Sequence, residues 1–462
     1  MEELSIVVLV GTNPLPCYLV ARQLIASLHK TPSDPPYHLW LVHSGDNPKI
    51  RQSGTKGQAD RVLSALVEQG MVPAGQAGLV ALSDVSSPLT IRREMTARLK
   101  SRIGSVRQDT AAVHVDYTGG TKSMSVSLAQ VAEELADVAS FTFSYLDAHT
   151  STMIFDGLNP SLYRSRFDIP VSGRSPDLRS IFPLCVATLM KLHGLGEGKS
   201  EEFDFPETDR ILDELINAFS PCGIDDFLEY VKEKLRKLLG SGGRKSSRQS
   251  CAQNLERCLT DNPGLGTDAL FIKNDAVRMV MSSPELHPLV TTTPGGSLSL
   301  RASYQGQSPV ELKHILEYLD GHWLENYVYN VCRELQTTLG PHTDTQKGVD
   351  CRPLATKNSD VHSDIDVAFM NGYQLTAISI TTSLSRHICK SKGFEVLLRA
   401  SQMGGEESRS VLLTGLCPDD VAGLREDLKT VTGSLSDHLL VLGRADWPRF
   451  ILSNRLQDHI LA

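Results

Sequence analysis

The sequence predicts an α/β protein built from two α/β units and a mostly helical segment between them. In the N-terminal third, short apolar runs alternate four times with segments of helical periodicity. Near the C-terminus the expected order is helix, hairpin, helix, strand, and the stretch between these two regions is dominated by helical patterns. A chain of 462 residues has room for two to four domains, each with its own core.

The N-terminal alternation indicates a doubly wound parallel sheet. Residues 4–10 form a nearly continuous run of leucine and β-branched residues, which is typical of a parallel strand buried on both faces. Further strands are expected at 38–43, 79–82 and 111–115, with helices at about 16–30, 55–71, 88–103 and 124–136, and a closing hairpin at 139–146 and 151–155. In such sheets ligands bind beyond the carboxyl ends of the strands.

The turn after the fourth strand has the sequence Asp-Tyr-Thr-Gly-Gly-Thr-Lys-Ser at residues 116–123. Adjacent glycines allow the main chain to approach a ligand closely, and turn amides next to a helix N-terminus form an anion-binding concavity. Thr121 and Ser123 add hydroxyl groups, and Lys122 adds a positive charge. The turn is therefore suited to bind phosphate, and an ordinary turn with Thr121 as N-cap is the alternative. The Walker and Rossmann glycine fingerprints are both absent from the sequence.

Because ligands bind beyond the carboxyl ends of the strands, the candidate ligand-binding residues are expected on one rim of the sheet. These residues are Gly11, Thr12, Asn13, Ser44, Thr118, Gly119, Gly120, Thr121, Lys122 and Ser123.

The Thr-Gly-Gly-Thr-Lys segment resembles the loop of CARF domains, the sensors of cyclic oligoadenylate in type III CRISPR antiviral defence. The chain as a whole resembles the Card- and Can-type ancillary effectors, which join a CARF domain to a PD-(D/E)xK nuclease-like domain. This resemblance implies a Rossmann-like CARF domain at 1–160, a mostly helical connector at 161–307 and a restriction-endonuclease-like domain at 308–462. It also implies a cyclic oligoadenylate, with cyclic tetra-adenylate expected, as the activator. A two-fold ring matches a pair of loops from two subunits, so we expect a homodimer.

The region before the C-terminal unit carries fewer signals. Helices are expected at 180–193, 207–218 and 225–239, and a flexible basic loop follows at 240–247. Residues 289–307 are rich in Thr, Ser, Gly and Pro and indicate a turn-rich hairpin or a linker.

The C-terminal pattern matches the order of the PD-(D/E)xK core. Helices are expected at 310–319, 321–329 and 387–399, and strands at 363–369, 374–380, 411–413 and 438–442, with a tight Asn371-Gly372 turn inside the hairpin.

The resemblance implies catalytic residues on this core. Nucleases of this class use carboxylates to hold magnesium and a lysine to orient the attacking water. Glu325 lies where the family has its helix glutamate, and Asp364 and Asp366 lie in the aspartate motif, so Glu325 and Asp366 are the expected ligands of Mg²⁺ or Mn²⁺. Two plainer interpretations remain: an exposed helix glutamate, and an aspartate pair that only caps a hairpin.

The family's Glu-x-Lys element is replaced by Ser379 and Thr381. A hydroxyl is a weak magnesium ligand and threonine carries no charge, so activity requires compensation from Lys390 or Lys392, with Asp364 or Glu395 as the missing carboxylate. One hypothesis is a cyclic-oligoadenylate-controlled endonuclease acting on single-stranded RNA or DNA. A second is a catalytically inactive sensor that binds the messenger and a partner or nucleic acid. A third is a generic nucleotide-binding protein whose C-terminal unit only dimerises.

Composition limits the remaining classes. The chain has 40% hydrophobic and 22% charged residues, which is ordinary for a globular protein, and its net charge of −8 argues against a protein that coats nucleic acid. Nine scattered cysteines without Cys-x-x-Cys pairs indicate reduced thiols and a cytoplasmic location. The apolar run at 4–10 is too short to span a membrane, so no membrane partner is expected.

Overall fold

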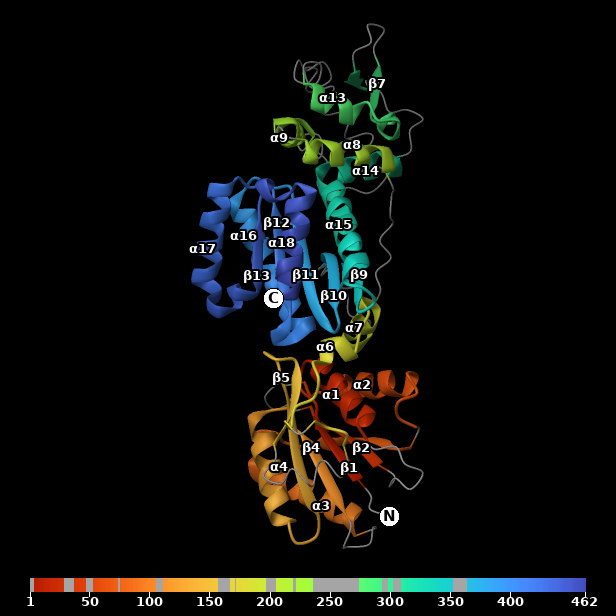
Figure 1. The fold of residues 1–462 in the computed structure, drawn as a ribbon, viewed down its shortest axis with the longest axis vertical. Coiled ribbons are helices and arrows are strands. Elements are labelled where there is room, and N and C mark those ends of the chain that lie inside the picture. Colours follow the sequence, from red (N-terminus) through yellow and green to blue (C-terminus); the bar gives the residue numbers. More distant parts are fainter. Residues whose placement is uncertain are drawn as a thin grey trace.

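The computed structural model describes residues 4–28, 37–46, 53–73, 75–104, 111–156, 167–170, 172–196, 205–218, 222–235, 274–292, 298–301, 309–351 and 364–462. The N-terminal α/β unit occupies one end of an elongated molecule, the second α/β unit lies in the middle, and a group of helices lies at the far end (Figure 1). The expected basic loop at 240–247, and parts of the segments expected at 225–239 and 289–307, fall outside the described residues.

The N-terminal sheet has six strands in the order β3-β2-β1-β4-β5-β6. Strands β1 to β5 are parallel to their neighbours, and β6 is antiparallel to β5. Every residue of β1 is buried, as a strand covered on both faces must be. The strands are β1 (Leu4–Leu9), β2 (Tyr37–Ser44), β3 (Ala77–Leu82), β4 (Ala112–Asp116), β5 (Ser140–Asp147) and β6 (Thr152–Asp156).

Helices cover both faces of this sheet, which confirms the doubly wound prediction. The apolar faces of α1 and α2 contribute to one core, and those of α3 and α4 contribute to a second core on the opposite face. The helices are α1 (Pro14–Ala26), α2 (Lys56–Glu68), α3 (Pro88–Ile103) and α4 (Lys122–Glu134). Helix α1 begins at Asn13, whose side chain accepts a hydrogen bond from the N–H of Leu15, and it ends earlier than the expected residue 30.

The segment after β6 turns back against both α/β units. The single helix expected at 180–193 is two helices, α6 (Leu178–Ile181) and α7 (Val186–His193), because Pro183 lacks the N–H that a continuous helix requires. Helix α7 contacts α1 and α2 of the N-terminal unit and also strands of the second unit. One continuous apolar core therefore runs through the junction.

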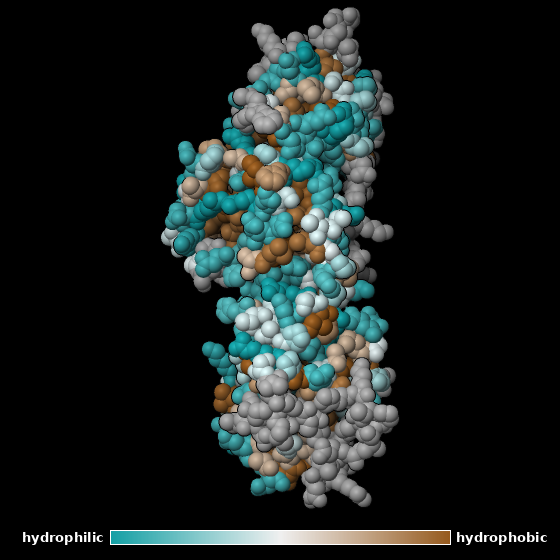
Figure 2. Space-filling view, in the orientation of Figure 1, coloured by the Kyte–Doolittle hydropathy of each residue, from teal (hydrophilic) through white to brown (hydrophobic). Residues whose placement is uncertain are grey.

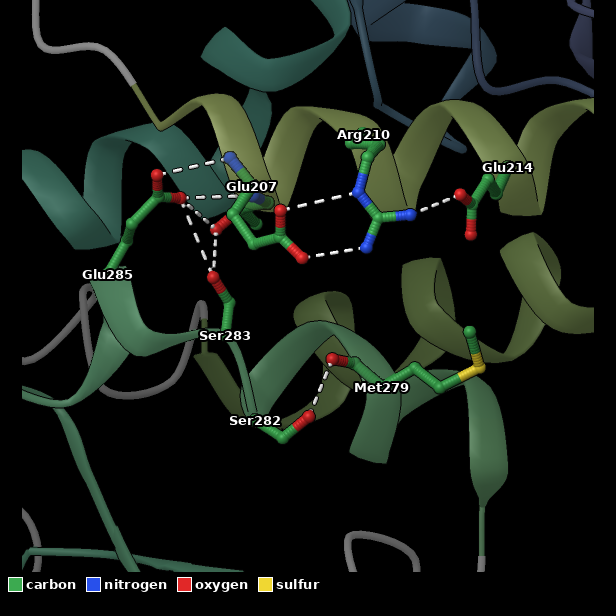
Figure 3. Close-up of polar contacts among 8 residues, drawn as sticks. Glu207, Arg210, Glu214, Met279, Ser282, Ser283 and Glu285 are labelled. Atoms are coloured by element: carbon green, nitrogen blue, oxygen red, sulfur yellow. Dashed lines mark hydrogen bonds and ion pairs between the residues drawn. The ribbon is translucent and has the colours of Figure 1, made fainter.

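The remaining helices of this region lie beyond the second α/β unit (Figure 1). They are α8 (Pro206–Asn217), α9 (Cys222–Tyr230) with the π-helical turn η3 (Val231–Leu235), α13 (Asp275–Met281) and the turn η6 (Pro284–Leu286), and they accompany an antiparallel pair of strands, β7 (Val290–Thr292) and β8 (Leu298–Leu300). The carboxylate of Glu285 caps the start of α8, where it accepts hydrogen bonds from the N–H groups of Glu207 at 3.1 Å and Thr208 at 3.0 Å (Figure 3).

The second α/β unit has a five-stranded sheet in the order β13-β12-β11-β10-β9. Strand β10 is antiparallel to both of its neighbours, β9 and β11, and β11, β12 and β13 are parallel. The strands are β9 (Thr343–Asp350), β10 (Asp364–Asn371), β11 (Gln374–Thr381), β12 (Arg409–Thr414) and β13 (Leu439–Leu442). The edge strand β9 is not among the strands expected from the sequence, because its alternating residues are mostly polar.

Helices flank this sheet as well. Helices α14 (Pro309–Glu317) and α15 (Trp323–Leu339) are joined by the π-helical turn η7 (Tyr318–His322), which contains a kink at Gly321. Helices α16 (Arg386–Gly404), α17 (Pro418–Thr432) and α18 (Arg449–Leu461) follow, with short turns η8 (Gly405–Glu407), η9 (Gly433–His438) and η10 (Arg444–Asp446).

The face drawn in Figure 2 is mostly hydrophilic, and its apolar side chains lie in several separate groups. Among the described helices, none combines the length and the apolar character needed to cross a membrane.

Candidate functional site

Two glycine-containing turns meet at the carboxyl edge of the N-terminal sheet. A Cβ atom on Gly11 would lie 3.2 Å from the amide nitrogen of Gly120, and one on Gly119 would lie 2.1 Å from the carbonyl oxygen of Leu9. Gly120 has a φ of +77°, which side chains disfavour. The turn after β1 and the turn after β4 are therefore packed backbone against backbone, which leaves their amides close together.

A buried polar network holds the second turn in place. Asp116 accepts hydrogen bonds from the N–H of Thr118 at 2.9 Å and from the hydroxyl of Ser144 at 2.8 Å. Burial raises the pKa of Asp116 to about 6. His114 lies between Ser144 and Thr142, with its ring nitrogens 2.9 and 2.8 Å from their hydroxyl oxygens, and burial lowers its pKa to about 3. A neutral imidazole that donates to Ser144 and accepts from Thr142 satisfies all of these groups.

Four of the predicted ligand-binding side chains make contacts that shape the rim. Asn13 caps α1, and Thr121 caps α4 by accepting from the N–H of Met124 at 3.3 Å. The hydroxyl oxygen of Thr118 accepts from the N–H of Leu146 at 2.8 Å, and that of Ser44 accepts from the N–H of Thr55 at 3.0 Å. These side chains fix the turns to the sheet. The sequence predicted such a role for Thr121, as an N-cap, and placed Asn13, Ser44 and Thr118 on the rim without it.

The remaining predicted residues differ in exposure. Thr12, Gly120 and Lys122 are exposed, as is Thr121, whereas Gly11, Gly119 and Ser123 are half-buried. The rim thus presents main-chain amides, the N-terminus of α4 and a lysine cation on one surface. This combination suits a ligand that carries phosphate groups.

The rim faces the second α/β unit of the same chain. A Cβ atom on Gly405, at the start of η8, would lie 3.1 Å from Nδ2 of Asn13. That nitrogen is buried and has no hydrogen-bond partner among the described residues. A rim residue therefore touches the second unit directly.

The second unit has a polar site where its sheet divides. The ladder between β10 and β11 ends at the pair Val367 and Ile378, whereas β11 stays paired with β12 as far as Thr381. Beyond that end, the carboxylate of Asp366 accepts hydrogen bonds from the N–H of Ile380 at 2.6 Å and from the hydroxyl of Ser379 at 3.3 Å. The aspartate thus takes the place of the missing backbone partner.

Glu325 on α15 and Asp366 on β10 form a carboxylate pair at this point. Burial raises the pKa of Asp366, and the negative charge of Glu325 raises it further. Burial also raises the pKa of Glu325, against the opposing charges of Lys347 and Lys392. Two carboxylates and two lysines therefore interact within one site.

The other predicted catalytic residues differ in their position. The positive charge of Lys392 on α16 lowers the pKa of both Glu325 and Asp366. Lys390 lies two residues away, about 200° around the helix, and so on another face of it. Asp364 is exposed, and its negative charge raises the pKa of Glu325. Ser379 is buried against Asp366, and the hydroxyl oxygen of Thr381 accepts from the N–H of Ser383 at 3.2 Å.

Lys347 is the residue of this site that the sequence reasoning missed. It lies on β9, the strand that was not expected, and its ammonium group donates a hydrogen bond to Asn326, the residue after Glu325. The signal in the sequence was a run of polar residues at 343–347, of which the structure shows 343–346 as alternately buried and half-buried, with Lys347 half-buried.

The carboxylate pair fits the donor set of Mg²⁺ or Mn²⁺. Magnesium is commonly held by one or two carboxylates together with water, and a cation beside Glu325 and Asp366 relieves the repulsion between them. Within the described residues, no group of three or more His, Cys, Asp and Glu side chains is arranged to hold a metal ion.

Comparison with solved structures identifies similar folds over the whole chain. The crystal structure of protein VC1899 from Vibrio cholerae matches with a TM-score of 0.57 and 13% identity, covering 99% of this chain and 98% of that one. Can2 from Sulfobacillus thermosulfidooxidans, solved in complex with cyclic tetra-adenylate, matches with a TM-score of 0.55 and 13% identity, covering 99% of this chain and all of that one. No protein-family model and no curated protein matches the sequence. The likeness concerns the fold: the chain has a CARF-like, Rossmann-type N-terminal unit and shares the full-length architecture of these two proteins.

Proposed function

We propose that this protein is a cytoplasmic sensor of cyclic oligoadenylate in type III CRISPR antiviral defence, with cyclic tetra-adenylate as its expected ligand. The observation that carries the proposal is the backbone contact between the turns at Gly11 and Gly120, beside the exposed Lys122. The amides of the two turns and the N-terminus of α4 suit the repeated phosphates of the ring. The cyclic tetra-adenylate bound in the Can2 structure, a protein of similar fold, supports the same ligand class.

Replacing Lys122 with alanine tests this site. A charge-assisted hydrogen bond to phosphate contributes about 1.5–3 kcal/mol, so Lys122→Ala is expected to weaken binding of cyclic tetra-adenylate roughly ten- to a hundredfold. Calorimetric titration of the full chain measures this affinity. Lys100→Ala is the matched control, because Lys100 is also exposed but lies in the last turn of α3, away from the rim. Equal affinity in wild type and Lys122→Ala would show that the ring binds elsewhere.

We further propose that the second α/β unit hydrolyses phosphodiester bonds in single-stranded RNA or DNA when the ring is bound. The observation that favours this function over an inactive sensor is the pair Glu325 and Asp366 with a lysine charge acting on both carboxylates. These two residues would hold Mg²⁺ or Mn²⁺, which supplies charge stabilisation at the phosphate.

Asp366→Ala tests the cleavage. The substitution removes one of the two carboxylates, so metal-dependent cleavage is expected to fall to background while affinity for cyclic tetra-adenylate stays at the wild-type value. Single-stranded RNA, single-stranded DNA and supercoiled DNA, each with and without the ring, are the substrates to assay. Ring-stimulated cleavage that survives in Asp366→Ala would place the catalytic residues elsewhere. Ring binding without cleavage of any substrate by the wild type would favour the inactive sensor.

A further inference from the structure

A chain of hydrogen bonds reaches the carboxylate site from the far helical group. The hydroxyl of Tyr318 donates to the carboxylate of Asp209 at 2.6 Å, and the side-chain nitrogen of Asn326 donates to the same carboxylate at 3.1 Å. The side-chain oxygen of Asn326 in turn accepts from the ammonium group of Lys347. The chain therefore links α8, η7, α15 and β9, and neither the sensor site nor the carboxylate pair requires it.

Asp209, at one end of this series of hydrogen bonds, lies in a helix turn that other contacts hold in place. Asp209 lies in the first turn of α8, the turn whose N–H groups at Glu207 and Thr208 are capped by the carboxylate of Glu285. The hydroxyl of Thr208 also donates to Glu285 at 2.7 Å, and on the outer side of the helix Arg210 bridges Glu207 and Glu214 (Figure 3). The start of α8 is thus anchored to η6 independently of Lys347.

Lys347, at the other end of this series of hydrogen bonds, lies at the carboxylate site. In the sheet register, Lys347 on β9 pairs with Val367, the neighbour of Asp366 on β10. Its hydrogen-bond acceptor, Asn326, directly follows Glu325 on α15. Asn326 uses both ends of its amide, because one donates to Asp209 while the other accepts from Lys347, and it is only 9% exposed. The ammonium group is therefore held against α15, the helix that carries Glu325, and its charge acts on the Glu325 carboxylate.

We propose that Lys347 supplies the cation that Thr381 cannot supply, and that Asn326, Asp209 and Tyr318 position it. This inference rests on the proposed phosphodiester cleavage. In that reaction a lone pair of a water oxygen forms a new bond to phosphorus, the electrons of the broken P–O bond remain on the leaving oxygen, and a proton from the water ends on that oxygen. The Lys347 ammonium keeps its proton throughout and stabilises the negative charge that develops on the phosphoryl oxygens.

The cleavage assay gives the first test, with the full chain, cyclic tetra-adenylate and Mn²⁺. Lys347→Ala is expected to lower kcat about a hundredfold with a smaller change in KM, and Lys347→Arg is expected to recover at least about tenfold of that loss because it retains the charge. Lys429→Ala, on the exposed side of α17, is the matched control. Full activity in Lys347→Ala would overturn the role of Lys347 and leave the proposed cleavage intact.

A double-mutant cycle tests the positioning residues. Asp209→Asn is expected to lower kcat about tenfold in the wild type and to have no further effect in Lys347→Ala, since its effect acts through the lysine. Equal losses in both backgrounds would show that Asp209 only stabilises the fold, and would overturn its positioning role.

A metal titration gives a readout that does not depend on cleavage. Removing a cation that acts on Glu325 is expected to raise the affinity of the site for Mn²⁺ at least about fivefold in Lys347→Ala. Asp366→Ala identifies which bound Mn²⁺ belongs to the site, and Lys429→Ala should match the wild type. If the wild type cleaves nothing, the proposed cleavage fails, and unchanged Mn²⁺ affinity in Lys347→Ala would then overturn the placement of Lys347 as well.

Discussion

At the scale of single residues, the junction between the two α/β units contains a carboxyl group in an unfavourable environment. Glu407 lies in η8, two residues after the glycine that touches Asn13, and its main-chain oxygen accepts from Gln374 at 2.7 Å. Burial raises the pKa of the Glu407 carboxyl from its ordinary value of 4.5 to about 7, against smaller opposing effects of Tyr373 and Arg179. The junction therefore binds a proton more tightly in the folded protein than in the unfolded chain.

Protonation of Glu407 makes the free energy of unfolding depend on pH. Between about pH 4.5 and 7 the folded state holds more protons at Glu407 than the unfolded state does, so the free energy of unfolding falls as the pH rises through this window. Glu407→Gln cannot ionise, and its stability relative to the wild type is expected to rise by on the order of 1 kcal/mol between pH 5 and pH 7. Denaturant unfolding at the two pH values measures the difference, with the exposed Glu426→Gln as control. Parallel curves for wild type and Glu407→Gln would contradict the burial of this charge.

At the level of secondary structure, both sites form beyond the ends of strand ladders. The glycine turns follow the carboxyl ends of β1 and β4, and they approach closely because neither Gly11 nor Gly119 carries a side chain. In the second unit, β10 and β11 separate beyond the pair Val367 and Ile378, and the freed N–H of Ile380 is satisfied by Asp366, which precedes Val367. Elements that diverge leave room for a ligand, and polar side chains then complete the main-chain hydrogen bonds.

At the scale of the whole molecule, the rim and the second unit face one another across a junction that shares one apolar core. Ring binding at Gly11–Asn13 would therefore occur beside η8, which follows directly on α16, the helix that carries Lys392. A single rim contacts only part of a cyclic ligand.

We therefore expect a two-fold homodimer formed through the N-terminal unit, in which two rims enclose one ring. Light scattering of the full chain at micromolar concentration should give twice the chain mass of 50.6 kDa. Calorimetry should give one ring bound per two chains. A monomeric mass that cyclic tetra-adenylate does not change would contradict this assembly.

Local sequence patterns predict the alternation of strands and helices in the N-terminal unit, the order of the helices and the hairpin around residues 364–381, and the glycine turn. These features follow from local patterns: continuous apolar runs for buried strands, helical periodicity for α3, and adjacent glycines for a close turn. The break at Pro183 was also available from a local rule, but the apolar residues on either side of it favoured one continuous helix.

Contacts between polar residues that lie far apart in the chain depend on how the elements pack. Lys347 lies 22 residues after Glu325 and 19 before Asp366 in the chain, on a strand whose polar alternation is weak, and the packing of β9 against α15 brings it to Asn326, beside Glu325. The same holds for Asp209, which reaches Asn326 across 117 positions, and for Asn13, which touches Gly405. Local patterns report the face of one element, whereas hydrogen bonds between distant elements depend on how those elements pack, and no local pattern carries that information.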